Sequence, residues 1–451
     1  MRNRPLAALF WLALAAAPAA TPVLAQAPAN ALAADTSWVT RSAIYQIFVR
    51  DFSPAGTFRG VIDGLDRVEA VGADVIWLMP IHPIGVSNRK GSLGSPYAVV
   101  DYYALNPDMG TRADFRELVR AVHARGMKLI IDWVPNHTAH DAVWTTAHAG
   151  FHVRDSAGRL TTPRDEKGNL TDWTDVAQLD YGNPALRQAM LSAMRYWLEE
   201  FGIDGFRVDV AGFVPDGFWR EAVPALRRAV PRPILLLAEW GDPKMHRLGF
   251  DLTYGWDPYA RLKEVWKGAS ASAFVQKEVA EMQAWPRGGM RLRFTTNHDE
   301  TAWDNPPVTL FGGPAGARAA QVATALLPGR PMLYNGQEVE SPLKLRLFEK
   351  DTIDWNAPGL PASRAFYRRV MELSRTLRAG DFTAVTTSAP EDVIAYRRGE
   401  AVVLVNPRPR EVRFSVTGVA VDGMRDLLTD RTHAGTTLAL PAHGAMVLAP
   451  R

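Results

Sequence analysis

The sequence predicts an α/β fold, a (β/α)8 TIM barrel with a short irregular insertion after strand 3 and a C-terminal antiparallel β domain. Through most of the chain, short apolar runs typical of buried strands alternate with helical patterns. This alternation is typical of a parallel sheet covered by helices. Eight such runs follow one another, which favours a closed barrel over an open sheet. From about residue 379, short alternating strands separated by turn residues predict an antiparallel β domain.

The elements of the first part of the barrel have clear boundaries. Strands are predicted at 43–49, 74–80 and 128–133. Pro80 ends the second strand because proline cannot donate a backbone hydrogen bond. One helix is predicted over 61–71. A second begins after Thr111, a residue type that caps helix N-termini, and ends near Gly126.

Residues 138–182 interrupt this alternation. The segment is rich in glycine and charge and has no helical period, so it predicts a small irregular subdomain inserted after strand 3. A long amphipathic helix over 184–201 restores the pattern. The remaining strands are predicted at 204–210, 233–238, 249–254, 291–296 and 331–334.

The N-terminus has the pattern of a signal peptide. Arg2 and Arg4 precede an apolar run over 6–20, and small residues follow up to Ala25. A membrane anchor is the alternative, but the run is short for a span and contains Pro18. We therefore expect export to the periplasm or the medium, with no stable membrane insertion after cleavage. The predicted organisation is a signal peptide at 1–25, a linker at 26–36, a catalytic barrel at 37–378 with 138–182 as its inserted subdomain, and a C-terminal β-sandwich domain at 379–451.

Composition narrows the classes of partner. The chain of 451 residues contains no cysteine, which excludes disulfides and a thiol nucleophile. Its formal charge is +3, and removing Arg2 and Arg4 from the 51 basic residues leaves 49 against 48 acidic ones. Because no basic run stands out, nucleic acid is not an expected partner. The sequence predicts no particular oligomeric state.

Four polar segments each follow an apolar run, so each places its side chains where a strand ends. Arg207 and Asp209 are two residues apart on a strand and therefore point to one face. A guanidinium beside a carboxylate favours its ionised form, which a nucleophile requires, although such a pair alone can be a plain ion pair. Glu239 stands between an apolar strand and Trp240, where burial raises a carboxyl pKa, although a single glutamate after a strand is often solvated. The segments are 132–137, 205–209, 238–240 and 297–299.

Taken together, these residue types fit one reaction. An ionised nucleophile, a protonated acid, a third carboxylate at Asp299 and neutral donors at His137 and His298 suit cleavage of a glycosidic bond through a covalent intermediate. The chain has no cysteine, so the clustered Cys/His spacings of metal sites are absent from the sequence. The sequence therefore favours a glycosidase that works without a metal.

At these segments the chain resembles the α-amylase family, glycoside hydrolase family 13. The resemblance implies that Asp209 is the nucleophile, Glu239 the acid/base and Asp299 the stabiliser of the transition state. It also implies that four further residues line the sugar subsite at the cleavage point. These are Tyr97, His137, Arg207 and His298. The matching motifs are Asp132-x-x-x-Asn136-His137, Gly205-Phe206-Arg207-x-Asp209, Glu239 and Phe294-x-x-Asn297-His298-Asp299.

The chain also departs from the family pattern. Calcium-binding members usually have Lys and His where this chain has Gly212 and Phe213, and an aspartate where it has Gln178. We therefore expect no cofactor and no shared family calcium site. Exo-acting relatives carry an aspartate at the position of Ala98, so its loss favours an open cleft. Val210 is seen in members that act on α-1,6 bonds or have mixed action.

These observations predict an exported, retaining α-glucan hydrolase of the α-amylase type, acting on α-1,4-glucosidic bonds of starch or maltodextrins. An α-glucan oligosaccharide or polysaccharide is the expected partner. Two alternatives share the fold. One is a cyclomaltodextrinase/neopullulanase-like or glucanotransferase activity. The other is a non-catalytic glucan-binding relative, a class that typically lacks one or more catalytic carboxylates, whereas all three are present here.

Overall fold

The structure is a computed structural model that describes residues 37–357, 359–377 and 381–451. The signal peptide predicted at 1–25 and the linker predicted at 26–36 lie outside the described residues. Both remain predictions.

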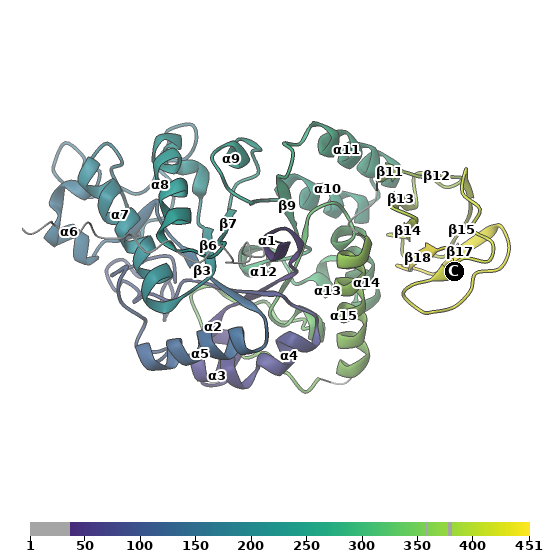
Figure 1. Ribbon diagram of the computed structural model, residues 1–451, viewed down its shortest axis with the longest axis horizontal. Coiled ribbons are helices and arrows are strands. Elements are labelled where there is room, and N and C mark those ends of the chain that lie inside the picture. Colours follow the sequence, from purple (N-terminus) through teal and green to yellow (C-terminus); the bar gives the residue numbers. More distant parts are fainter. Residues whose placement is uncertain (1–36, 358, 378–380) are drawn as a thin grey trace, which may run out of the picture. The chain divides into compact units, whose positions relative to one another are not determined.

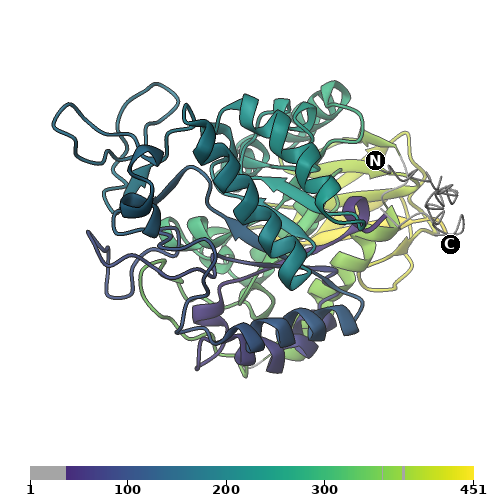
Figure 2. The same ribbon diagram turned by 60° about the vertical axis from the view of Figure 1, so that its left-hand side comes forward.

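Eight parallel strands close into a barrel in the order β1-β10-β9-β8-β7-β6-β3-β2 (Figures 1 and 2). Every residue of β1 and of β7 is buried, as expected for strands that face the barrel interior on one side and helices on the other. The barrel and the antiparallel sheets that follow it confirm the predicted fold class. The barrel strands are β1 (Ile44–Ile47), β2 (Val75–Leu78), β3 (Lys128–Trp133), β6 (Gly205–Val208), β7 (Leu235–Ala238), β8 (Leu252–Tyr254), β9 (Met290–Arg293) and β10 (Arg330–Tyr334).

Helices occupy the connections between the barrel strands (Figure 1). Thr111 caps one of them as predicted: its hydroxyl accepts from the backbone of Asp114, whose carboxylate accepts from Thr111 in return. None of the helices in the described residues is long and apolar enough to cross a membrane. The helices of the barrel region are α1 (Ser37–Arg41), α2 (Val49–Phe52), α3 (Phe58–Asp63), α4 (Leu65–Ala70), α5 (Arg112–Ala124), α7 (Pro184–Tyr196), α8 (Asp216–Ala229), α9 (Lys244–Arg247), α10 (Trp256–Trp266), α11 (Ala271–Ala284), α12 (His298–Trp303), α13 (Pro307–Leu310), α14 (Pro314–Ala325) and α15 (Leu360–Thr376).

Two predicted helices differ from the structure. The helix expected over 61–71 is divided into α3 and α4 at Gly64, where an added Cβ would lie 2.4 Å from the ring of Phe52. The helix expected over 184–201 ends at Tyr196 and continues as a π-helical turn, Trp197–Phe201. Neither difference alters the path of the chain between strands.

The inserted segment after β3 contains more regular structure than its irregular sequence suggests. Strand β4 (His137–Ala139) pairs antiparallel with β5 (Val176–Gln178), and helix α6 (Val143–Ala147) lies between them in the chain. Ala98, from the loop after β2, shares a small buried core with Ala139 and Val176 of this pair. The insertion is therefore packed against the loop that follows β2.

The C-terminal strands form two antiparallel sheets, ordered β11-β13-β14-β18-β16 and β12-β15-β17. Leu404 of the first sheet and Phe414 of the second share one buried core. The hydroxyl of Tyr396 donates to the carbonyl of Ala323 in α14 at 3.0 Å, which joins this domain to the barrel helices. The strands are β11 (Phe382–Ala384), β12 (Thr386–Thr387), β13 (Ile394–Arg398), β14 (Ala401–Val405), β15 (Val412–Thr417), β16 (Arg425–Asp426), β17 (Thr437–Leu440) and β18 (Ala445–Ala449).

Candidate active site

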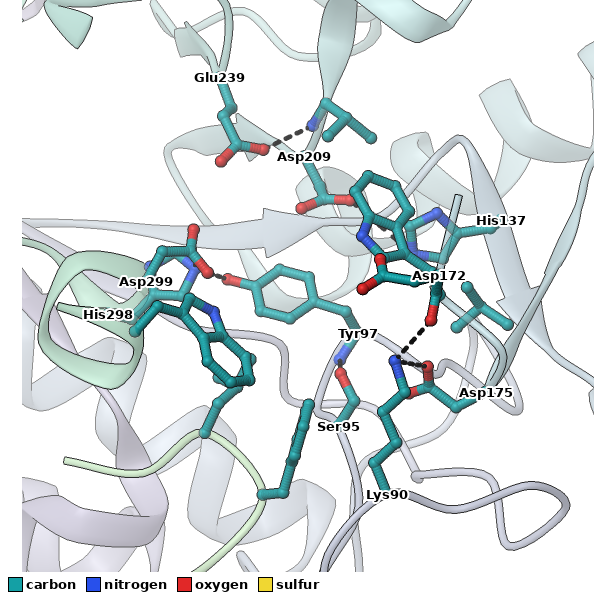
Figure 3. Close-up of a pocket in the computed structure, with 16 residues that line it drawn as sticks. Lys90, Ser95, Tyr97, His137, Asp172, Asp175, Asp209, Glu239, His298 and Asp299 are labelled. Carbon is teal, nitrogen blue, oxygen red and sulfur yellow. Dashed lines mark hydrogen bonds and ion pairs between the residues drawn. The ribbon is translucent and has the colours of Figure 1, made fainter. Parts of the chain in front are cut away.

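The carboxyl ends of the barrel strands bring the predicted polar segments to one cavity of about 390 Å³. Asp209 directly follows β6, and Glu239 directly follows β7. Six of the seven predicted site residues line the cavity, and Figure 3 shows them facing one another across it. They are Tyr97, His137, Asp209, Glu239, His298 and Asp299. The seventh, Arg207, is fully buried and contacts the carboxylates of Asp209 and Glu239.

Arg207 holds three carboxylates together. Its Nη1 lies 2.7 Å from Oδ1 of Asp132 and 3.1 Å from Oδ1 of Asp209, and its Nη2 lies 2.7 Å from Oε1 of Glu239. Its Nε donates to the hydroxyl of Tyr254 at 3.1 Å. A single buried guanidinium thus fixes the positions of two carboxyl groups that open into the cavity.

Asp132 belongs to this network, although the sequence analysis did not assign it to the site. The carboxylate is fully buried and accepts from the indole of Trp77 at 3.3 Å and from the hydroxyl of Tyr97 at 3.0 Å. The signal was present, because Asp132 opens one of the four polar segments. Asp132 lies on β3, which pairs with β6, and it stands directly opposite Arg207 in that pair. This register explains why the two side chains meet.

His298 occupies a defined tautomer in the hydrogen-bond network. The amide nitrogen of Gln46 lies 2.7 Å from Nδ1, and an amide nitrogen can only donate, so Nδ1 accepts and Nε2 carries the proton. That Nε2 lies 2.6 Å from the hydroxyl of Tyr97 and 3.1 Å from Oδ2 of Asp299. Gln46, on β1, was not predicted from the sequence, because no motif surrounds it.

His137 is a neutral side chain in the wall of the cavity. Burial lowers the pKa of His137 to about 3, so its imidazole stays uncharged at neutral pH. Its Nε2 lies 3.9 Å from Oδ2 of Asp209. The ring can therefore donate to a ligand hydroxyl beside Asp209 without adding a positive charge.

The carboxyl groups differ in their affinity for protons. Burial raises the pKa of Asp209 to about 7 and that of Glu239 to about 8, against the opposing effect of Arg207. Burial would also raise the pKa of Asp299, but His298 and Arg207 outweigh it and lower that pKa. Arg207 thus pairs with Asp209 as the sequence predicted and acts to lower its pKa, but burial and the carboxylates of Asp132 and Asp299 outweigh this effect, so the pKa of Asp209 is raised overall.

Val210 adopts a conformation that valine rarely takes. Its φ of 34° and ψ of 48° lie in the left-handed region, which is strained for a β-branched residue. In this conformation its backbone N–H donates to Oε2 of Glu239 at 2.7 Å. The turn after β6 thus orients the carboxyl group that follows β7.

Aromatic side chains border the cavity on two sides. Trp173 of the insertion packs against Phe213 with ring centroids 6.0 Å apart, and Phe213 packs against Trp240 at 5.3 Å. Trp303 is 62% exposed and packs against Phe348, with ring centroids 5.6 Å apart. Exposed rings beside a polar cavity are suited to stacking on the apolar faces of sugar rings.

Gln178, which stands where calcium-binding members carry an aspartate, presents a hydrogen-bond donor. The side-chain amide nitrogen of Gln178 lies 3.0 Å from Oδ1 of Asn136, 3.1 Å from its carbonyl oxygen and 3.2 Å from the carbonyl oxygen of Leu179. Calcium is bound by oxygen ligands, so an amide N–H directed at these oxygens takes the place of a cation. At Gly212, an added Cβ would lie 2.0 Å from the indole of Trp240, which leaves no room for a side chain. These residues do not fit calcium.

Comparisons with known proteins agree with this arrangement. Residues 36–228 match the family model for the α-amylase catalytic domain. The chain is 31% identical over 309 residues to the α-amylase MalA of Haloarcula japonica, a match that covers 67% of this chain but 44% of MalA. The chain thus spans less than half the length of that relative.

Solved structures match more of the chain. An α-amylase from Lactobacillus plantarum superposes with a TM-score of 0.80 at 30% identity, covering 91% of this chain and 99% of that one. A maltogenic α-amylase, AmyB of Thermotoga neapolitana, superposes with a TM-score of 0.78 at 29% identity, covering 91% and 98%. The chain belongs to the α-amylase family of glycoside hydrolases, family 13.

Proposed function

We propose that this protein is a retaining α-glucan hydrolase of the α-amylase type, which cleaves α-1,4-glucosidic bonds of starch or maltodextrins through a covalent glycosyl-enzyme intermediate. The observation that carries the proposal is the pairing of Asp209 and Glu239 through Arg207 at one cavity. Two carboxyl groups on one sugar subsite, one a nucleophile and the other an acid, are what a retaining mechanism requires. The likeness to the α-amylases of Lactobacillus plantarum and Thermotoga neapolitana supports the choice of substrate.

In this mechanism, a carboxylate oxygen of Asp209 attacks the anomeric carbon while Glu239 gives its proton to the glycosidic oxygen. The C–O bond to the leaving sugar breaks, and an ester to Asp209 forms. Glu239 then takes a proton from water, whose oxygen attacks the anomeric carbon and releases Asp209. Burial raises the pKa of Glu239, which supports a protonated Glu239 at the start.

The remaining residues hold the sugar at the attacked carbon. Asp299, whose pKa is lowered, presents an ionised carboxylate that stabilises the positive charge developing on the sugar ring. The neutral His137 donates to a sugar hydroxyl, the Nε2–H of His298 holds Tyr97 and Asp299 in place, and the ring of Tyr97 forms a stacking surface.

Asp209→Asn tests the proposal. Replacing the nucleophile should lower turnover of maltoheptaose by several orders of magnitude while leaving the fold, measured by circular dichroism, unchanged. Asp155→Asn, on an exposed turn of the insertion, is the matched control. Unchanged turnover in Asp209→Asn would refute Asp209 as the nucleophile, whereas a wild-type protein that binds maltoheptaose without cleaving it would favour the non-catalytic glucan-binding alternative.

A second candidate on the same site is a cyclomaltodextrinase/neopullulanase-like or glucanotransferase activity. Val210, which lines the cavity beside Glu239, favours it, because this residue type occurs in relatives that act on α-1,6 bonds. Chromatography of products from maltoheptaose, pullulan and cyclodextrin separates the candidates. Shortened oligomers from maltoheptaose indicate hydrolysis, and lengthened ones indicate transfer to a sugar acceptor.

Two further properties belong to the proposal. The apolar run after Arg4 supports export to the periplasm or the medium. The amide of Gln178, directed at the oxygens of Asn136, supports activity without calcium.

A further inference from the structure

One end of the cavity is bordered by the loop over 83–97, which connects β2 with α5. This loop is fixed to the insertion on one side, where the backbone N–H groups of Val86 and Ser87 donate to Oδ2 of Asp141 at 2.9 and 3.2 Å. On the other side, the N–H of Leu93 donates to the carbonyl of Phe348 at 3.0 Å. The loop therefore extends from the insertion to the segment that follows β10.

Arg50 joins the loop over 83–97 to the segment that follows β10. Its guanidinium Nη1 donates to the carbonyl of Gly94 at 3.3 Å and to that of Leu347 at 3.1 Å, and the residue is 8% exposed. Ser92 adds a hydrogen bond from its N–H to Oε1 of Glu349 at 2.9 Å. Because one buried arginine binds carbonyls of both, the loop over 83–97 and the segment 347–349 are held together. We call these two segments the wall.

Lys90 connects the wall to the insertion. Its ammonium Nζ donates to the carbonyl oxygen of Asp172 at 3.0 Å and lies 3.2 Å from Oδ1 of Asp175, which is 5% exposed. Lys90, Asp172 and Asp175 line the same cavity as Asp209 and Glu239. Figure 3 shows the contacts of Lys90 on the side of Tyr97 that faces away from Glu239.

This position fixes which end of the substrate meets the wall. Glu239 protonates the oxygen of the leaving sugar, so the reducing-end part of the chain lies on the side of Glu239. The wall lies on the opposite side, beyond Tyr97 (Figure 3), so the non-reducing end of a sugar attacked by Asp209 would face the wall. A volume of about 390 Å³ is near the low end of the roughly 300–1,000 Å³ typical of ligand pockets, which suits a short glycone.

We propose that Lys90 and the loop over 83–97 close the glycone end of the site, so that the enzyme removes short maltooligosaccharides from the non-reducing ends of α-glucans instead of cutting inside the chain. Lys90 is thus a specificity-determining residue, and this inference rests on the proposed hydrolase function. It replaces the open cleft that Ala98 led us to expect. Ala98 is 3% exposed and packs into the core of the insertion, so closure comes from Lys90, earlier in the same loop.

The test compares two substrates, 4-nitrophenyl maltoheptaoside with a free non-reducing end and the same compound with that end blocked by an ethylidene group. The wild-type enzyme should cleave the free substrate at least about 10-fold faster, because the blocked end cannot enter a closed pocket. Lys90→Ala should reduce that ratio at least threefold. Lys267→Ala, which removes an exposed ion pair with Glu264, should keep the wild-type ratio.

The outcomes separate the inference from the proposed function. Equal cleavage of the free and blocked substrates by the wild-type enzyme, or an unchanged ratio in Lys90→Ala, would overturn the inference and leave the hydrolase assignment intact. Cleavage of neither substrate would instead overturn the proposed function. Lys90→Met, which keeps the aliphatic stem, serves if the alanine variant does not fold, and it should show the same reduced ratio.

Discussion

The backbone N–H of Val210 donates to Oε2 of Glu239 at 2.7 Å, and it does so from a left-handed conformation with a φ of 34°. The left-handed region costs roughly 1–2 kcal/mol for a residue with a Cβ. The strain is retained where a backbone donor meets the carboxyl group proposed as the acid. Local strain beside reacting groups is common in enzymes, where it fixes their geometry.

Val210→Asn should therefore raise the free energy of unfolding by about 1 kcal/mol, because asparagine tolerates the left-handed region. Urea denaturation measures this change. The value of kcat/KM on maltoheptaose should fall, because Val210 lines the cavity. Val143→Asn is a control without strain, since Val143 is exposed at the start of a helix, and it should give no gain. A loss of stability in Val210→Asn would show that side-chain packing, not φ, dominates at this position.

Glu239→Gln should abolish acid catalysis while leaving the nucleophile in place. On maltoheptaose, kcat should fall by roughly 10²–10⁴-fold, the usual contribution of a positioned general acid. On maltosyl fluoride, whose leaving group needs no proton, formation of the covalent intermediate should fall far less. Glu264→Gln, at an exposed ion pair, is the matched control. An equal loss on both substrates would argue that Glu239 has a structural role.

The pH profile of kcat/KM should be bell-shaped, with its maximum between about 7 and 8. Asp209 must be ionised, so activity rises as the pH passes its pKa of about 7. Glu239 must be protonated, so activity falls above its pKa of about 8. The two limbs report the coupled pair, since both groups contact Arg207. An alkaline limb that persists in Glu239→Gln would contradict the assignment.

Asp132→Asn offers a directional test of the same network. The negative charge of Asp132 raises the pKa of Asp209, so removing that charge should move the acidic limb to lower pH. Near-ultraviolet circular dichroism checks that the packing around Arg207 survives. Asp155→Asn, on an exposed turn, should leave the limb in place. A shift to higher pH would mean that displacement of Arg207 outweighs the lost charge.

The barrel could be predicted from the sequence because its strands are nearly continuous apolar runs that end at polar segments. The prediction for strand β9 was wrong at its C-terminal end. The strand was expected over 291–296, but it ends at Arg293. The hydroxyl of Thr295 donates to Oε1 of Gln321 at 3.1 Å, so this residue belongs to the loop. The end of β9 could not be predicted from the pattern of apolar residues, because that pattern does not reveal the hydrogen bond between Thr295 and Gln321.

The approach of Asp209, Glu239 and Asp299 to one another follows from a similar pattern, since residues at or just after strand ends meet where a barrel closes. The contacts of Lys90 were not predictable. Its partners, Asp172 and Asp175, come from an insertion whose path depends on packing against Ala98. Gln46 was also missed, because a single glutamine within an apolar strand gives no signal until His298 is placed beside it.

Calcium should have no effect on the stability of this protein. The amide of Gln178 already donates to the oxygens of Asn136 and Leu179, where a cation would otherwise lie. The melting temperature should therefore be the same in excess calcium and in excess chelator. Gln178→Asp should lower the melting temperature in chelator, because it removes these hydrogen bonds and places a carboxylate beside carbonyl oxygens.

The same variant should regain stability when calcium is added, since carboxylate and carbonyl oxygens are the ligands that calcium prefers. Scanning calorimetry with and without chelator measures both effects. Gln188→Asp, on the exposed face of α7, controls for the added charge and should show no calcium dependence. A wild-type protein that loses stability in chelator would refute the proposal, because the Gln178 amide and a bound cation cannot occupy the same position.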